Sequence, residues 1–261
     1  MTMLKIDRDG SCLTLTLDDP ASRNALSAEM VAALGSAVAD AAADPTLQAL
    51  VLRGANRSFC VGANLKGIGG SAPIGFDDAY RYNREGAAIF ATIASLPVAV
   101  VAVIDGPAFA GGLGLACCAD VVLCGPDAKF ALSETAVGLV PAQIAPYVVG
   151  RIGLPAARRL CLTAATFGPA EALAIGLADE VHDSAEALEA AVARTVKAIR
   201  RCAPGANAAT KALLRSLGDA RGADYVDEAA RIFATAVTGE EGREGIAAFI
   251  EKRKPRWVGE G

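Results

Sequence analysis

The chain has 261 residues, of which 53% are hydrophobic and only 5% aromatic, so alanine and branched aliphatic side chains must fill its core. Its formal net charge of −4 argues against a general nucleic-acid-binding surface. The N-terminal sequence lacks the apolar core of a signal peptide, and the apolar run 98–104 is too short to cross a bilayer. The seven cysteines include no CxxC pair, which is typical of reduced thiols in a cytoplasmic protein.

Alternating and continuous apolar runs predict an α/β core over the first half of the chain. A hairpin is expected across Asp9-Gly10. Helices are expected over 28–43 and, with the Asp77-Asp78 pair as its cap, over 79–96. Strands that alternate with helices at this spacing favour a parallel sheet with right-handed crossovers. The expected strands are 4–8, 12–17, 48–53, 98–104, 120–124 and 129–132.

From Gln143 onward the apolar pattern is almost entirely helical, and only residues 180–182 could add extended structure. An all-helical last third with apolar faces needs a surface to cover them, either the α/β core or another subunit. The expected helices are 155–162, 169–175, 185–201, 207–217, 224–237 and 241–253.

The stretch from residue 98 to residue 120 has the features of a ligand site. Its first strand is an unbroken β-branched run, as expected for a strand buried on both faces, and Asp105-Gly106-Pro107 then turns the chain. Gly111 and Gly112 begin a helix of small residues, where free backbone N–H groups could approach an anion or an oxygen that becomes one. The same glycines could instead serve tight packing of the helix against the sheet, and the stretch alone leaves both interpretations open.

The rest of the sequence excludes several common kinds of catalytic site. His182 is the only histidine, which removes most Ser-His-Asp and Cys-His arrangements, and no cysteine or histidine cluster has metal-ligand spacing. Neither the GxGxxG pattern nor the GxxxxGK(S/T) phosphate loop occurs. Two glycine-bearing turns remain, 58–66 and 111–112, and each follows a strand. Because such loops meet at one edge of a parallel sheet, each turn could direct one backbone N–H at the same oxygen, as in an oxyanion hole.

Five segments, in order, resemble the motifs of the crotonase superfamily, also known as the enoyl-CoA hydratase/isomerase superfamily. They are Arg23-Asn24-Ala25-Leu26, SFCVGANLK, DGPAFAGGLGLACCAD, FALSETAVGLVPA and EGIAAFIEKRKPRW, and the similarity covers nearly the whole chain. The resemblance implies an α/β fold of the ClpP/crotonase class, with a spiral core around a parallel sheet. It also implies that residues 1–200 form this core and that residues 201–261 form a helical trimerisation region.

The resemblance further implies roles for individual residues. The backbone N–H groups of Ala63 and Gly111 would hold a thioester oxygen as it becomes an enolate, and Glu134 would be the catalytic acid and base. Without the motif around it, Glu134 would be interpreted as a capping or surface carboxylate at a turn. The residues implied to bind the acyl-CoA are Arg23, Cys60, Val61, Ala63, Leu65, Lys66, Gly111, Gly114, Phe233 and Lys252.

Two positions depart from the family pattern. Gly114 takes the place of the second glutamate of the hydratase motif, and Asn64 stands where aspartate is usual. One glutamate suits the transfer of a proton between C2 and C4, whereas hydration also needs a placed water, which the backbone or Gln143 could hold. The sequence therefore predicts an enzyme of the lyase or isomerase class that hydrates or shifts the double bond of an enoyl-CoA.

The expected enzyme needs no metal and no redox cofactor, since coenzyme A is part of the substrate. The resemblance implies a homotrimer or homohexamer without nucleic-acid or membrane partners. Two alternatives stay open: an acyl-CoA decarboxylase or hydrolase of the same fold, and an acyl-CoA-binding protein without catalysis, which Gly114 suggests. Cys60 is expected to be a small apolar filler rather than a nucleophile, and His182 to lie remote from the chemistry.

Overall fold

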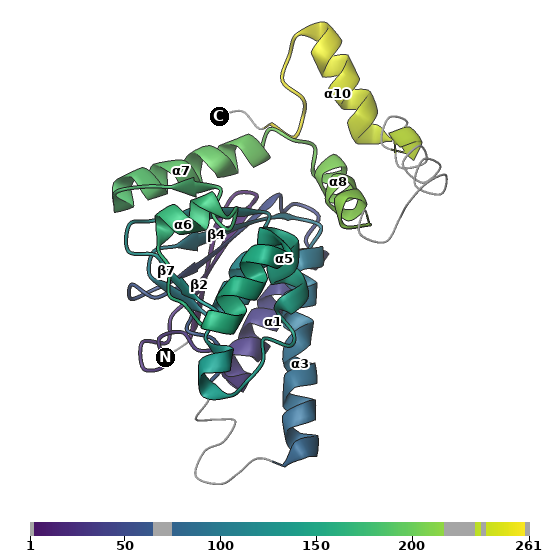
Figure 1. The fold of residues 1–261 in the computed structure, drawn as a ribbon. Coiled ribbons are helices and arrows are strands. Elements are labelled where there is room, and N and C mark those ends of the chain that lie inside the picture. Colours follow the sequence, from purple (N-terminus) through teal and green to yellow (C-terminus); the bar gives the residue numbers. More distant parts are fainter. Residues whose placement is uncertain (1–2, 65–74, 217–232, 236–238, 259–261) are drawn as a thin grey trace.

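The computed structural model describes residues 3–64, 75–216, 233–235 and 239–258. Six strands form the main sheet in the order β1-β2-β3-β4-β6-β8 (Figure 1). β1 and β2 pair antiparallel across the expected hairpin, and the other four pairs of this sheet are parallel. The predicted parallel sheet is therefore confirmed. The strands are β1 Leu4–Asp9, β2 Cys12–Leu17, β3 Ala49–Gly54, β4 Ala99–Ile104, β6 Val121–Cys124 and β8 Glu180–Val181.

Helices cover both faces of this sheet (Figure 1). Successive residues of a strand point to opposite faces, so β4 sends Val100 and Ala102 into a core shared with α1, α3 and α5. It sends Val101 and Val103 to the other face, where they pack with Leu188 of α7. The unbroken apolar sequence of β4 reflects this double burial. The core helices are α1 Ala28–Ala43, α3 Phe76–Ser95, α4 Gly111–Cys117, α5 Ala145–Thr163, α6 Pro169–Ala174 and α7 Ala185–Ile199.

Serine side chains cap two of the core helices, α1 and α7. Ser27 caps α1 by accepting a hydrogen bond from the Met30 N–H, and Ser184 caps α7 in the same way. The predicted Asp77-Asp78 cap of α3 is wrong, because the helix begins at Phe76 and Gly75 is its N-cap. The two aspartates lie in the first turn instead, where the positive end of the helix dipole favours their charge.

Two elements differ from the expected ones. Pro107–Phe109 forms β5, which pairs in parallel with β7 (Lys129–Ala131) as a separate small sheet, although the sequence suggests only a turn at its start. α5 begins at Ala145, well before the expected start at Pro155, because it consists of two helical runs joined at Gly153. Gly153 has a positive φ of 72°, which breaks the regular periodicity of the sequence pattern.

The C-terminal helices α8 (Pro204–Ser216) and α10 (Glu240–Glu251) extend away from the sheet (Figure 1). Lys211 ties α8 to the core, since its ammonium group donates to Asp120 Oδ2 at 2.6 Å and to the Val98 carbonyl at 3.2 Å. The helix predicted over 224–237 lies almost entirely outside the described residues.

Glu241 of α10 caps the first turn of α8. Its carboxylate accepts hydrogen bonds from the N–H groups of Gly205 at 3.0 Å and Ala206 at 3.1 Å. The first N–H groups of a helix have no partner within the helix, so a carboxylate here stabilises the helix end. The cap therefore joins α8 and α10 into one unit.

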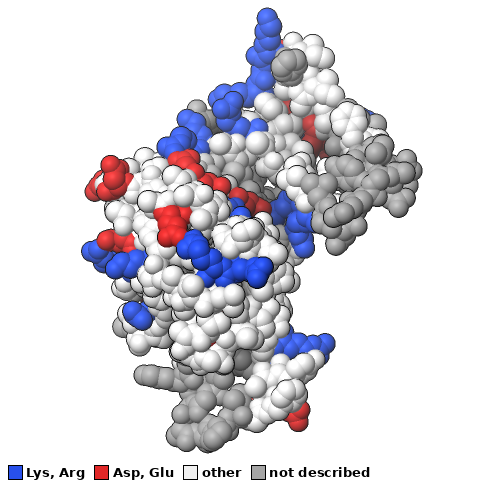
Figure 2. Space-filling view, viewed as in Figure 1, with Lys and Arg blue, Asp and Glu red and all other residues white. Residues whose placement is uncertain are grey.

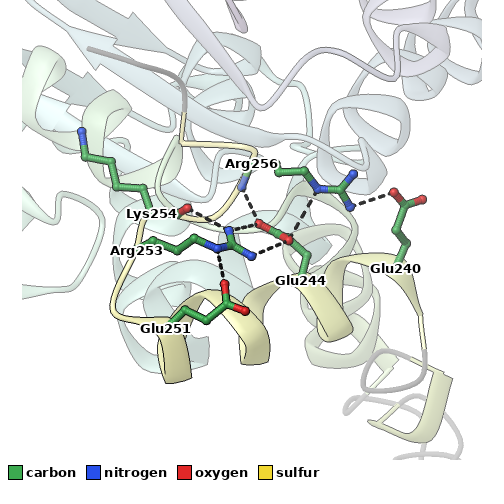
Figure 3. A network of polar contacts seen from close by, with 6 residues as sticks. All are labelled: Glu240, Glu244, Glu251, Arg253, Lys254 and Arg256. Carbon is green, nitrogen blue, oxygen red and sulfur yellow. Dashed lines mark hydrogen bonds and ion pairs between the residues drawn. The ribbon is translucent and has the colours of Figure 1, made fainter.

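A network of ion pairs holds the chain that follows α10 (Figure 3). Glu244, whose side chain is only 11% exposed, accepts from Arg253 Nη1 at 2.6 Å and from the Arg256 N–H at 2.9 Å. The hydrogen bond from Arg253 lowers the pKa of the Glu244 carboxyl to about 2. Trp257 Nε1 then donates to the Arg201 carbonyl at 3.2 Å, which returns the tail to the turn after α7.

On the surface that Figure 2 shows, Lys and Arg side chains lie next to Asp and Glu side chains. This mixture matches ion pairs such as those between Arg151 and Asp179 and between Arg159 and Glu171. Within the described ranges, no helix has both the length and the apolar character that crossing a membrane requires.

Candidate active site

Two chain segments, one after β3 and one after β4, are joined by backbone hydrogen bonds. The Cys60 N–H donates to the Pro107 carbonyl at 3.0 Å, and the Phe109 N–H donates to the Cys60 carbonyl at 2.9 Å. Together they form a parallel bridge between Cys60 and Ala108. Because β3 and β4 are neighbours in the sheet, the two glycine-bearing turns meet at one edge, as the sequence predicts.

Glycine allows the backbones of the two turns to approach closely. Gly62 has a φ of 90°, and a Cβ at this position would lie 2.8 Å from Ala110 Cβ and 3.2 Å from the Gly111 nitrogen. A Cβ on Gly112 would lie only 2.1 Å from the Cys60 carbonyl oxygen. Side chains at 62 or 112 would therefore push the two turns apart.

The backbone N–H groups of Ala63 and Gly111 belong to these facing turns. Neither has a hydrogen-bond acceptor among the described residues. Ala110, just before Gly111, has an unfavourable positive φ of 48°, and its N–H donates to the Ala131 carbonyl at 2.9 Å, which holds the strained turn in place. A ligand oxygen that reached both N–H groups would be bound as in an oxyanion hole.

The Asn24 side chain anchors the turn that leads to Ala63. Its side chain is fully buried, and its Nδ2 donates to the Ser58 carbonyl at 2.7 Å and to the Phe59 carbonyl at 3.3 Å. Its Oδ1 accepts from the Asp19 N–H at 2.7 Å. These bonds connect the entry to α1 with the backbone that leads to Ala63.

Glu134 begins the short 3₁₀ helix η1 (Glu134–Val137). This helix follows β7, whose last residue, Ala131, accepts the hydrogen bond from Ala110, so the same small sheet holds the turn before Gly111 and leads to Glu134. The Oε2 atom of Glu134 is buried and has no hydrogen-bond partner in the described part of the chain. Burial raises the pKa of the Glu134 carboxyl above its usual range, which suits a group that exchanges protons.

Gly114 lies one turn along α4 from Gly111, against an apolar wall. A Cβ on Gly114 would lie 2.3 Å from Ile144 Cγ2 and 3.3 Å from Phe90 Cε1. Phe90 also lies near Gly111, since a Cβ there would be 3.8 Å from Phe90 Cζ. The space beside Gly114 is thus already filled by aliphatic and aromatic side chains.

The other predicted site residues are placed as follows. Arg23 is exposed, and its carbonyl accepts from Ser58 Oγ at 3.1 Å. Cys60 is fully buried, and burial raises the pKa of its thiol to about 12, so it remains a neutral, small packing residue as expected. Val61 is half-buried beside it. Leu65 and Lys66 lie outside the described residues.

Phe233 and Lys252 are not brought to the two turns within one chain. Phe233 is 70% exposed, and Lys252 is an exposed residue directly after α10, the helix that extends away from the sheet (Figure 1). His182 follows β8, where its N–H donates to the Cys124 carbonyl at 2.8 Å. It therefore sits at the end of an edge strand, as expected.

Sequence reasoning missed three structural contributors to this region: Asn24, Phe90 and Ile144. Their roles depend on contacts between distant segments, and only the asparagine, a polar residue ahead of a helix, carries a local signal. Gln143, considered as a possible holder of water, donates its side-chain amide to Asn83 Oδ1 of α3 at 2.7 Å. This bond fixes the chain just before Ile144 against α3.

Comparisons with known proteins agree with this architecture. The sequence model of the enoyl-CoA hydratase/isomerase family matches residues 7–260. The structure of Pseudomonas aeruginosa AtuE is similar with a TM-score of 0.95 and 44% identity, covering 99% of this chain and 100% of that one. An enoyl-CoA hydratase/isomerase from Marinobacter aquaeolei is similar with a TM-score of 0.92 and 38% identity, covering 98% and 99% of the two chains.

A curated relative points the same way. Carnitinyl-CoA dehydratase of Escherichia coli (strain K12) is 33% identical over 98% of this chain and 98% of its own length. The predicted crotonase fold is confirmed by the structural matches. Because the family model and the relatives span nearly the entire sequence, the chain belongs to the enoyl-CoA hydratase/isomerase family of the crotonase superfamily.

Proposed function

We propose that the protein forms an enolate from an enoyl-CoA thioester and completes either the hydration or the shift of its double bond. The N–H groups of Ala63 and Gly111 bind the thioester oxygen, where negative charge develops when a proton leaves C2 in the shift or when water adds at C3 in hydration. Each such donor is worth about 10²–10³ in rate. Two observations carry this proposal: the backbones at Gly62 and Gly111 approach each other closely, and the N–H groups of Ala63 and Gly111 have no acceptor among the described residues.

Glu134 is proposed to move the proton. In a double-bond shift it takes the proton from C2 of a 3-enoyl thioester and returns it at C4, so the electron pairs rearrange and no other reagent is consumed. In hydration, water supplies the hydroxyl that bonds to C3 and the proton that is added at C2. The raised pKa of the Glu134 carboxyl supports both uses, since the group must be able to hold and release a proton.

Different observations support the two outcomes. Hydration is favoured by the names of relatives such as carnitinyl-CoA dehydratase, because dehydration is the reverse of hydration. The double-bond shift is favoured by the apolar wall of Phe90 and Ile144 beside Gly114, which offers no group to place a water. The dienolate of the double-bond shift and the 3-hydroxy enolate of hydration both carry negative charge on the thioester oxygen, so the same two donors serve both outcomes.

The proposed reaction needs neither a metal nor a redox cofactor, because backbone N–H groups stabilise the enolate charge. Coenzyme A arrives with the substrate, and we infer that the segment 60–66 and Arg23 contact it from one subunit. Phe233 and Lys252 are then proposed to close over the coenzyme of a neighbouring subunit in a cytoplasmic homotrimer or homohexamer. Their exposure in the single chain supports this assignment.

The variant Glu134→Gln tests the role of the glutamate. It should retain acyl-CoA binding, measured by calorimetric titration, and lose about 10²–10⁴-fold in turnover of 2-enoyl- and 3-enoyl-CoA. Glu189→Gln is the matched control, since Glu189 is an exposed α7 residue paired with Arg53, and its activity should be unchanged. Undiminished turnover by Glu134→Gln would remove Glu134 from the mechanism.

The same assay, run in deuterated water with mass spectrometry, separates the alternatives. A shifted double bond with deuterium at C2 or C4 and no added mass of water shows an isomerase, and the added mass of water shows hydration. Release of carbon dioxide or of free coenzyme A thiol would instead identify a decarboxylase or hydrolase. Binding without any exchange would identify an acyl-CoA-binding protein.

A further inference from the structure

The space that a side chain at position 114 would enter lies next to Gly111. Phe90 and Ile144 bound this space. Gly114 is on the same side of α4 as Gly111, because residues three apart are neighbours on a helix. Phe90 confirms the shared space, since it lies 3.8 Å from the Cβ position of Gly111 and 3.3 Å from that of Gly114. A side chain at 114 would therefore point into the region next to the proposed oxyanion donors.

Ile144 already occupies this space. A Cβ at 114 would lie 2.3 Å from Ile144 Cγ2 and 2.8 Å from Ile144 Cβ, both too short for any real contact. Ile144 is only 3% exposed and cannot easily turn away. Its carbonyl accepts from the Val148 N–H at 3.0 Å in α5, and the preceding Gln143 is bonded to Asn83.

We propose that Ile144 is a specificity-determining residue that favours the double-bond shift, in which the proton returns at C4, over the addition of water to C3 of the enoyl thioester. This inference rests on the proposed function. Ile144 and Phe90 present only carbon atoms, and an ordered water needs two or more polar partners. By filling the place of a residue-114 side chain, Ile144 also prevents a second acid–base group from reaching the acyl chain from α4.

The variants that test this inference are Gly114→Glu, Ile144→Gly and the double variant that combines them. Glycine at 144 removes both atoms that overlap the Cβ at 114. Gly86→Glu on α3 is the matched control, because a Cβ at Gly86 has no atom within 4 Å. Thermal unfolding and the ratio of water addition to deuterium exchange on enoyl-CoA substrates are measured for each protein.

Gly114→Glu alone should lower the Tm strongly or prevent folding, whereas Gly86→Glu should leave the Tm nearly unchanged. The double variant should have a higher Tm than Gly114→Glu alone, because the overlap with Ile144 is gone. Its ratio of water addition to exchange should rise about 10²-fold over wild type, the lower end of what a placed acid–base group contributes. Ile144→Gly alone should raise the ratio by a smaller factor.

Two results would overturn the role of Ile144 and leave the proposed function standing. One is a Gly114→Glu protein as stable as wild type with Ile144 intact. The other is a folded double variant whose ratio of water addition to exchange equals that of wild type, while wild type itself exchanges deuterium. A wild-type protein that exchanges no deuterium on any enoyl-CoA would overturn the proposed function itself.

Discussion

The Glu134 carboxyl illustrates, at the scale of one residue, how catalysis and stability oppose each other. Its Oε2 atom is buried without a hydrogen-bond partner among the described residues, and burial raises the pKa of the carboxyl. A carboxyl that takes a proton from one carbon and returns it to another works best when its pKa is near the operating pH. The same burial makes the charged form of Glu134 unfavourable in the folded protein.

We predict that Glu134→Gln is more stable than wild type at neutral pH. The folded protein binds the Glu134 proton more tightly than the unfolded chain does, so wild type loses stability as pH rises from the unfolded pKa of about 4.3 through the raised folded pKa. Glutamine stays neutral and avoids this loss. In scanning calorimetry, the Tm values should coincide below about pH 4 and separate toward about pH 7. A Tm difference that is the same at every pH would refute this linkage.

At the scale of elements, the turns that carry Ala63 and Gly111 depend on segments that lie outside them. Asn24, at the entry to α1, holds the first turn because its side chain donates hydrogen bonds to the Ser58 and Phe59 carbonyls. The small β5–β7 sheet reaches the second turn through the bond from Ala110 to Ala131. The geometry of two backbone N–H groups is therefore set by buried hydrogen bonds, which are expensive to leave unmade.

The variant Asn24→Ala should reduce the free energy of unfolding by about 1–3 kcal/mol more than Asn56→Ala does. Both asparagines have a positive φ, 62° and 58°, so alanine meets the same backbone cost at each. Asn56 is exposed, and in the described part of the chain its side chain bonds only to Asp18, whereas loss of Asn24 leaves buried groups unpaired. Urea unfolding measures the difference, and kcat/KM should fall only for Asn24→Ala. Equal destabilisation by the two variants would exclude Asn24 as the anchor.

The sequence predicted the elements whose pattern reports burial directly. β4 is an unbroken apolar run because both of its faces are buried, and α1 has a serine cap that contacts its own first turn. β5 could not be predicted, because its pairing with β7 and its bonds to Cys60 come from distant segments. The start of α3 was predicted wrongly, since aspartates suit both a cap and a first turn.

The sequence predicts the site residues that belong to ordered motifs. It does not predict the contacts that depend on packing between distant segments. Ordered motifs located Ala63, Gly111 and Glu134, and the structure brings the first two onto facing turns. The roles of these residues stay predictions until the variants are measured. The contact of Ile144 with Gly114 was not predictable, because it joins helices α4 and α5 through side-chain shape alone.

At the scale of the whole molecule, the C-terminal helices carry apolar side chains that a single chain leaves in solvent. Ile246 and Ile250 share one side of α10, and Leu214 projects from α8. Polar contacts hold the unit in place, through Lys211 to the core and through Glu241 between the two helices. Exposed apolar surface of this kind marks an interface, here assigned to copies of the same chain in the proposed trimer.

Light scattering should give wild type a mass of about 80 or about 160 kDa, three or six times the 26.5 kDa chain, as for a closed symmetric oligomer. Ile250→Asp should release subunits, because burying an isoleucine contributes about 1.5–3 kcal/mol and a buried unpaired carboxylate opposes assembly. Ile6→Asp on the edge strand β1 is the control; Ile6 is 56% exposed and Ile250 71%. A monomeric wild type would contradict the assembly, and an assembled Ile250→Asp would move the interface elsewhere.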